Sequence, residues 1–187
     1  MLGVLIGFVA VLVCPAGLED APLRDGVSVL VIQLCPLLGP ALATSCFASP
    51  GRRLERLVAA RRGPNPVALR RAMWGASLSV GLVAGPVAAG LLRNFPLDLT
   101  AALGRNAVFG IGLALLSAAL LAPAGSWCPV VATGLVTWVF GGQDSFGSVV
   151  SWAFLLKPWE DWPWTVVAAL ILLVGLTVYV LFDGREA

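Results

Sequence analysis

Apolar residues run in long blocks along this chain, and short polar or proline-containing segments separate them. A helix needs about 20 residues to cross a bilayer core of about 30 Å, with a tolerance of several residues. We read six blocks as membrane-spanning helices, at 1–17, 27–46, 73–92, 106–122, 127–140 and 164–182. The pattern predicts an all-α polytopic integral membrane protein with about six transmembrane helices, forming a single transmembrane domain over 1–187.

Two of the apolar pieces are short. The block at 127–140 suits a re-entrant or tilted segment as well as a full span. The apolar stretch Ser145–Pro158 is also too short to cross comfortably, so we expect a re-entrant or interface-lying segment at about 143–163. Irregular backbone at membrane depth is tolerated only where it packs against protein.

Four tryptophans flank the last span: Trp152, Trp159, Trp162 and Trp164. Indole rings prefer the headgroup region, where one edge is hydrated and the rest is apolar. We interpret them as an aromatic belt at the outer interface, with a cluster that contacts substrate as the alternative.

The composition supports the membrane assignment and restricts the chemistry. Hydrophobic residues make up 59% of the chain, charged residues make up 12%, and the mean hydropathy is +0.93. Soluble domains usually have about a quarter charged residues. There is no histidine, which excludes Ser-His and Cys-His catalysis, and there is no GxxxxGK[ST] phosphate-binding loop. We therefore expect no enzyme, no metal site and no cofactor in this chain, and we read its four cysteines as small apolar filler.

Basic residues are concentrated in one segment. Residues 49–71 hold seven of the twelve Lys and Arg residues and one acid, Glu55. Because positive charges in short loops stay on the cytoplasmic side, loop 49–72 is predicted to be cytoplasmic, and six spans then place both termini there too. That topology puts eight basic residues inside, including Arg185, and four outside.

The same segment has the pattern of a short amphipathic helix. Ser49 and Pro50 form a good helix start, and Leu54, Leu57 and Val58 repeat at the spacing of one helix face. The sequence Gly63–Pro66 breaks this helix. Asn65 and Pro66 then start a second one, which continues into the span at 73–92 and is expected to project into the cytoplasm.

The composition of this loop fits three functions to different degrees. Its arginines are suited to setting topology and binding anionic lipid headgroups. Binding to nucleic acid has no other feature in its favour, so we expect no nucleic-acid partner. The third interpretation is docking to a cytoplasmic protein through an apolar stripe, with the charges fixing register. Its candidate residues are Arg52, Arg53, Leu54, Glu55, Arg56, Leu57, Val58 and Arg61.

The loop resembles the coupling helix of permease subunits of ATP-binding-cassette exporters, in the class that moves polysaccharides, drugs and peptides. The matching pieces are Glu55, Leu57, the break at Gly63–Pro66, and the basic entry Leu69-Arg70-Arg71. The six-helix layout is similar to that class. So is the stretch "GRNAVFGIGLALLSAALLAPAGSWCPVV" followed by "WAFLLKP", which looks like small permeases that actinobacteria encode beside cassette ATPases. Apolar sequence starts at Leu2, so the amphipathic helix that often precedes the first span of that class has no counterpart in this sequence; either this is a trimmed member of the class or its true start lies upstream.

The resemblance implies a transmembrane transporter subunit in a bacterial cytoplasmic membrane. Its expected partners are a separate cassette ATPase, which would carry ATP and Mg, and a second permease copy or paralogue. The expected cargo is a small molecule, a lipid-like compound or a peptide. The alternative is a non-transporting accessory or assembly protein whose basic loop binds anionic lipid.

Within the spans, polar residues are few. Gln33, Thr133 and Thr137 are candidates for lining a pathway, with interhelical hydrogen bonding as the alternative. Arg105 is expected at the outer start of its helix, with its side chain reaching the interface. Glycine and alanine in 75–90 and 104–112 would permit close helix packing, and Pro86 predicts a kink.

Overall fold

The computed structural model describes residues 33–47, 65–121, 125–141, 152–157 and 162–181. All regular elements in these ranges are helices, which confirms the predicted all-α class. The α-helices are α3 (Leu38–Phe47), α5 (Asn65–Leu92), α6 (Leu97–Leu120), α7 (Cys128–Phe140) and α8 (Trp162–Leu181). Two short 3-10 helices are η1 (Cys35–Leu37) and η2 (Phe154–Leu156).

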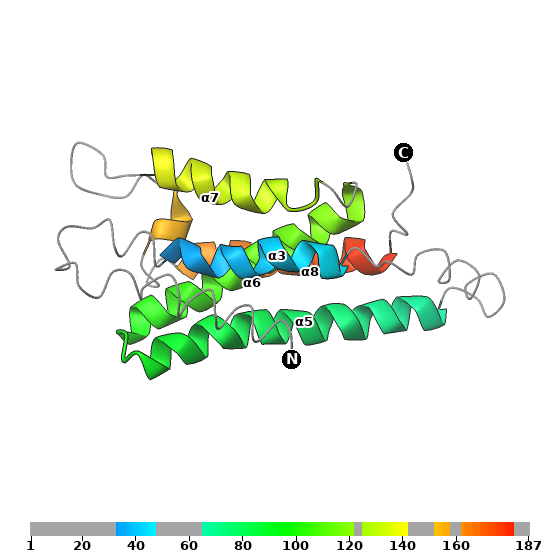
Figure 1. The fold of residues 1–187 in the computed structure, drawn as a ribbon, viewed down its shortest axis with the longest axis horizontal. Coiled ribbons are helices and arrows are strands. Elements are labelled where there is room, and N and C mark those ends of the chain that lie inside the picture. Colours follow the sequence, from blue (N-terminus) through cyan, green and yellow to red (C-terminus); the bar gives the residue numbers. More distant parts are fainter. Residues whose placement is uncertain (1–32, 48–64, 122–124, 142–151, 158–161, 182–187) are drawn as a thin grey trace.

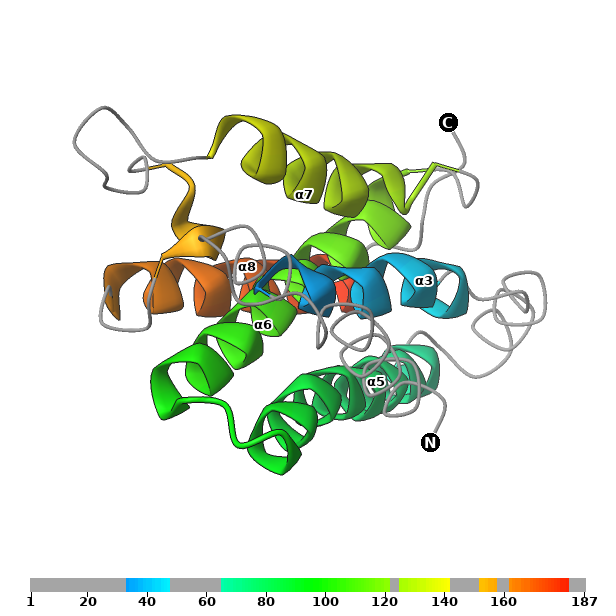
Figure 2. The same ribbon diagram turned by 60° about the vertical axis from the view of Figure 1, so that its left-hand side comes forward.

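The helices form a bundle in which each one runs antiparallel to the one before it (Figure 1). Helix α6 lies at the centre, with α3, α5, α7 and α8 around it (Figure 2). In its most apolar window 72% of α6 is buried, against 17% for α8. The bundle has two ends. The "Arg105 end" carries the α5–α6 turn, Gly141 and residues 152–157, and the "Cys128 end" carries the first turns of α5 and α7.

Three helices are long and apolar enough to cross a membrane: Ala72–Leu92, Leu97–Leu120 and Trp162–Leu181. Two further apolar helices, Cys35–Thr44 and Cys128–Phe140, are shorter. These findings agree with a membrane-associated helical protein. The count of six spans stays a prediction, because the segment 1–17 lies outside the described residues.

Helix α5 is continuous from Asn65 to Leu92, over 28 residues. This confirms the prediction that a helix starting at Asn65-Pro66 continues into the span. At 1.5 Å per residue it is about 42 Å long, which exceeds the bilayer core by about two turns. Pro86 is fully buried within it and does not end it.

Helix α6 begins at Leu97, nine residues before the predicted start at 106. Only a four-residue turn, Arg93 to Pro96, separates it from α5, and Asn94 adopts the left-handed conformation there (φ 55°). The prediction was wrong because the polar residues of this stretch suggested a loop. In the structure, Asp98 occupies the first turn of α6, where a negative charge stabilises a helix.

The other boundaries follow the predicted blocks closely. Gln33 and Leu34 are helical, η1 then contains Pro36, and α3 continues to Phe47. Proline lacks an N–H donor, which explains why the helix tightens locally at this point. Helix α8 begins two residues before the predicted start and ends one before the predicted end. The docking segment 50–62 lies outside the described residues.

Candidate functional site: a buried polar cluster at the Arg105 end

Arg105 is buried on α6, with 3% of its surface exposed. This contradicts the expectation that its side chain reaches the interface. Because α6 starts earlier than predicted, Arg105 lies more than two turns inside the helix. Its Nη2 donates to the carbonyl oxygens of Phe154 (2.8 Å) and Lys157 (2.7 Å). Its Nε donates to Asn106 Oδ1 at 3.2 Å.

Asn106 is fully buried and joins three segments of the chain. Its Nδ2 donates to the carbonyl oxygens of Gln33 (2.8 Å) and Leu155 (2.7 Å), while its Oδ1 accepts from Arg105. The two residues together tie the start of the α3 segment and residues 154–157 to the central helix. We call Gln33, Arg105 and Asn106, with the carbonyl groups they bind, the polar cluster.

Residues 152–157 form a short segment packed against the bundle, and the rest of the predicted re-entrant segment at about 143–163 lies mostly outside the described residues. A turn at Trp152 leads into η2, and Ala153, Leu155 and Leu156 are buried. Because this backbone is not α-helical, its carbonyl groups are available to side-chain donors. The segment also contacts the end of α7, since a Cβ placed on Gly141 would lie 2.7 Å from Ala153 Cβ.

Aromatic rings hold the segment from the side. Phe154 packs edge-on against Phe109 at a centroid distance of 5.0 Å and stacks on Trp164 at 4.9 Å with an interplanar angle of 11°. Trp152 and Trp162 are exposed. Trp164 instead contributes to packing, and Trp159 lies outside the described residues.

The three predicted pathway residues lie on two different helical segments. Gln33 is 6% exposed, lies in the polar cluster through its backbone carbonyl, and its side-chain Oε1 has no hydrogen-bond donor. Thr133 donates its hydroxyl to the carbonyl of Pro129 within α7 at 2.7 Å. Thr137 is buried on the same helix, one turn further on.

Cys35 is disulfide-bonded, which corrects its assignment as apolar filler. Its partner is not among the cysteines whose side chains the structure describes, since the other one, Cys128, is free and exposed. Cys35 begins η1, close to Gln33 and therefore at the Arg105 end. The spacing of the cysteines gave no signal of this bond.

The described residues contain no group of three or more His, Cys, Asp or Glu side chains arranged to hold a metal ion. The polar cluster is instead built of one cation, one amide and backbone carbonyl oxygens. Such a set fixes the relative positions of chain segments. Comparison with known protein families, with curated proteins and with solved structures gave no match to this chain.

The sequence signalled only part of this site. Gln33 was singled out because it is polar within an apolar block, and Arg105 because it is charged. The sequence does not mark Asn106 as a site residue, because it was placed at a helix end, where asparagine is common. The signal that would have found it is its adjacency to Arg105, since a charge inside a bundle needs polar neighbours.

Proposed function

We propose that this chain is the transmembrane subunit of an ATP-binding-cassette transporter that exports a small, lipid-like or peptide cargo. A separate ATPase subunit binds and hydrolyses ATP, and docks on the cationic segment 50–62. A second permease copy or paralogue completes the pathway. The proposal rests on the resemblance of the sequence to such permeases and on the form of α5.

The observation that carries the proposal is the continuity of α5 from Asn65. A helix that is longer than the bilayer core and directly follows the docking segment is suited to act as a lever. Movement of segment 50–62 would be passed along α5 as a rigid body. Helix α5 contacts both α6 and α8, so the movement would reach the centre of the bundle.

The polar cluster supplies the fixed reference for such a movement. It attaches residues 154–157 and Gln33 to α6, at the end of the bundle opposite to the start of α5 (Figure 1). If the ATPase moves the start of α5 at the Cys128 end, α5 would tilt while the polar cluster keeps the Arg105 end in place. In this proposal the cluster holds the outer side of the subunit together during transport.

Substitution of Glu55 tests the docking step. Glu55→Arg removes the single acid of the docking segment, so an interface that pairs with it loses an attraction and gains a repulsion. We expect co-purification of the ATPase from native membranes to fall by at least about tenfold, the equivalent of ~1.4 kcal/mol. Membrane insertion should be unchanged.

Glu186→Arg is the matched control, because it makes the same charge change in the polar tail. It should leave co-purification intact. Full recovery of the ATPase with Glu55→Arg would contradict the docking proposal. A different result would favour the lipid-binding accessory protein. In that case no ATPase is recovered with the wild-type chain or with Glu55→Arg, and Glu55→Arg strengthens binding of the purified chain to anionic vesicles.

A further inference from the structure

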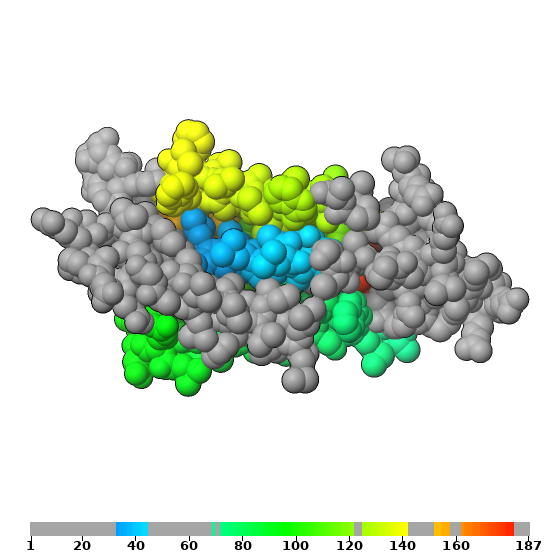
Figure 3. Space-filling model, in the orientation of Figure 1, coloured from blue at the N-terminus to red at the C-terminus, as the bar shows by residue number. Residues whose placement is uncertain are grey.

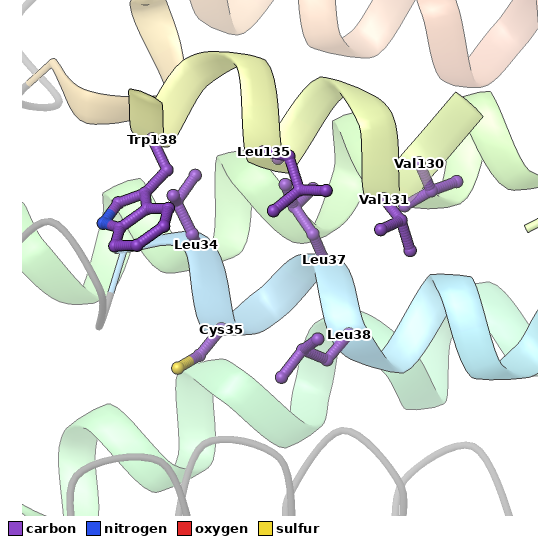
Figure 4. Close-up of a pocket in the computed structure, with 9 residues that line it drawn as sticks. Leu34, Cys35, Leu37, Leu38, Val130, Val131, Leu135 and Trp138 are labelled. Atoms are coloured by element: carbon purple, nitrogen blue, oxygen red, sulfur yellow. The ribbon is translucent and has the colours of Figure 1, made fainter. Parts of the chain in front are cut away.

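An apolar groove runs between α3 and α7, on the side of the bundle away from α5 (Figure 4). Its volume is about 320 Å³. One wall comes from η1 and the start of α3, and the other from one face of α7. The lining residues are Leu34, Cys35, Leu37, Leu38, Val130, Val131, Gly134, Leu135 and Trp138. Both walls reach the surface, where α3 and α7 lie side by side (Figure 3).

The groove is elongated along the helices. Trp138 lies beside Leu34 at one end, and Val130 and Val131 lie at the other (Figure 4). From Val130 to Trp138, α7 rises about 12 Å. The elongated shape of the groove suits one segment of a hydrocarbon chain.

The chemistry of the walls excludes a polypeptide in extended form. Of the nine lining side chains, only the indole of Trp138 carries a hydrogen-bonding group apart from the sulfur of Cys35. The polar groups of an extended backbone would remain unsatisfied there, at a cost of several kcal/mol each. An occupant of this groove must need no hydrogen bonds over most of its length.

A helix from the same chain or from a second copy satisfies its own backbone hydrogen bonds, so it is the competing occupant of the groove. The crosslinking experiment below distinguishes a helix from a lipid.

The groove also opens to the outside of the bundle. Leu38, Leu135 and Trp138 line it and are each about half exposed, so its opening faces the surroundings of the bundle. In a membrane those surroundings are acyl chains at very high concentration. Weak binding is then sufficient for high occupancy.

We propose that the groove between α3 and α7 binds one acyl chain of a bilayer phospholipid. The acyl chain fills the space that the two short helices leave between them, and it supports α7 against the rest of the bundle. This inference does not depend on the transport proposal. It assigns a lipid site to the described part of the molecule, whatever the cargo is.

Photo-crosslinking in a bilayer tests the proposal. The full chain is reconstituted in phosphatidylcholine vesicles that contain a phospholipid with a diazirine on one acyl chain, and labelled residues are mapped by peptide mass spectrometry. We expect label on 34–38 and 130–138 in clear excess over the exposed face of α8, around Leu170 and Val174. Ordinary lipid contact labels the α8 face and serves as the reference.

Two variants of α7 sharpen the test. Gly134 lines the groove, so Gly134→Phe should fill it and reduce labelling of 34–38 by more than about threefold, or ~0.7 kcal/mol. The close neighbour of a Cβ there is Leu37 Cδ1 at 3.3 Å, the mobile end of a side chain. Ala132→Phe adds the same ring at an exposed position of α7 outside the groove, and should leave labelling unchanged.

Three results would overturn the proposal. One is equal labelling of the groove and the α8 face in the wild-type chain. This result does not depend on whether any variant folds. Another is unchanged labelling of 34–38 in Gly134→Phe. The third is crosslinking of a reporter at the groove to residues 1–32 of this chain or to a second copy, which would make the groove a protein interface.

Discussion

Arg105 shows how a charge can be buried within a bundle that is otherwise apolar. A guanidinium in a membrane interior is costly unless its N–H groups are satisfied. Here the acceptors are the carbonyl oxygens of Phe154, in η2, and Lys157, just after it. The Phe154 oxygen also accepts the N–H of Lys157. The irregular backbone therefore supplies hydrogen-bond acceptors to the buried guanidinium.

Asn106 is the residue at which this arrangement is easiest to break. Asn106→Asp keeps the shape of the side chain but removes both N–H donors, and it faces the carbonyls of Gln33 and Leu155 with an acceptor. Each unsatisfied buried group costs about 1–3 kcal/mol. We expect the free energy of unfolding in mixed micelles to fall by about 3 kcal/mol.

Ser117→Ala is the matched control for Asn106→Asp. Ser117 is also a buried polar residue of α6, but its hydroxyl bonds only the Leu113 carbonyl of its own helix, at 2.6 Å. Its loss should cost less than about 1 kcal/mol. Equal effects of the two substitutions would show that the polar cluster does not join the segments energetically.

At the residue scale, the sequence marks unusual residues but not their contacts. Gln33 stands out as a glutamine within an apolar block, yet it joins the polar cluster through its backbone carbonyl, and its side-chain Oε1 has no hydrogen-bond partner. Arg105 was placed at the interface, because charge alone does not say whether nearby backbone can accept its hydrogen bonds. The disulfide of Cys35 was missed for a related reason, since pairing depends on which cysteines the fold brings together.

At the scale of helices, the closest contact is the crossing of α6 and α8. A Cβ on Gly112 would lie 2.6 Å from Leu172 N and 2.7 Å from Ile171 O, and a Cβ on Gly175 would meet the carbonyl of Gly112. Both helices therefore have a glycine where their backbones meet. Close approach of this kind supplies the van der Waals packing that drives helix association in membranes.

The predicted consequence is that Gly175→Ala separates α6 from α8. A methyl group cannot be accommodated by rotating a side chain, because the atoms it meets are backbone. We expect destabilisation of about 2–3 kcal/mol, as for overpacking in a core. Thermal unfolding of the purified chain, followed by loss of monodisperse protein, measures it.

Gly75→Ala is the control for that substitution. Gly75 also faces α8, but its nearest neighbours are side-chain atoms, Leu176 Cδ1 at 3.3 Å and Tyr179 Cε1 at 3.4 Å. Small rotations relieve those contacts, so the effect should be small. A Gly75→Ala variant as unstable as Gly175→Ala would argue against a backbone contact at the α6–α8 crossing.

The positions of the helices follow from the lengths of the apolar sequence blocks, except for the start of α6. The apolar blocks identified α5, α7 and α8 to within a few residues over their membrane parts. The start of α6 was missed because Thr100, Arg105 and Asn106 look like loop residues, yet all three are buried. Glycines of 104–112 were expected at close contacts, and Gly112 confirms this, whereas Gly175 was not expected there.

At the scale of the whole molecule, the antiparallel order of the helices gives the bundle two distinct ends. The Arg105 end contains the disulfide-bonded Cys35, and the Cys128 end contains the start of α5, which follows the arginine-rich segment. Because positive loops remain in the cytoplasm, the sequence predicts that the Cys128 end faces the cytoplasm and the Arg105 end faces outside. A disulfide at Cys35 is compatible with that prediction, since disulfides persist in oxidising compartments.

Cysteine labelling in intact cells tests that orientation. Asp98 is exposed in the first turn of α6 at the Arg105 end, and Cys128 is free and exposed at the other end. A membrane-impermeant maleimide should label Asp98→Cys in intact cells but label Cys128 only after permeabilisation, as read by peptide mass spectrometry. The reverse pattern would put segment 50–62 outside, where no ATPase can reach it, and the transporter proposal would then fail. The lipid site between α3 and α7 would survive that result, since a groove open to the bilayer does not depend on which end faces the cytoplasm.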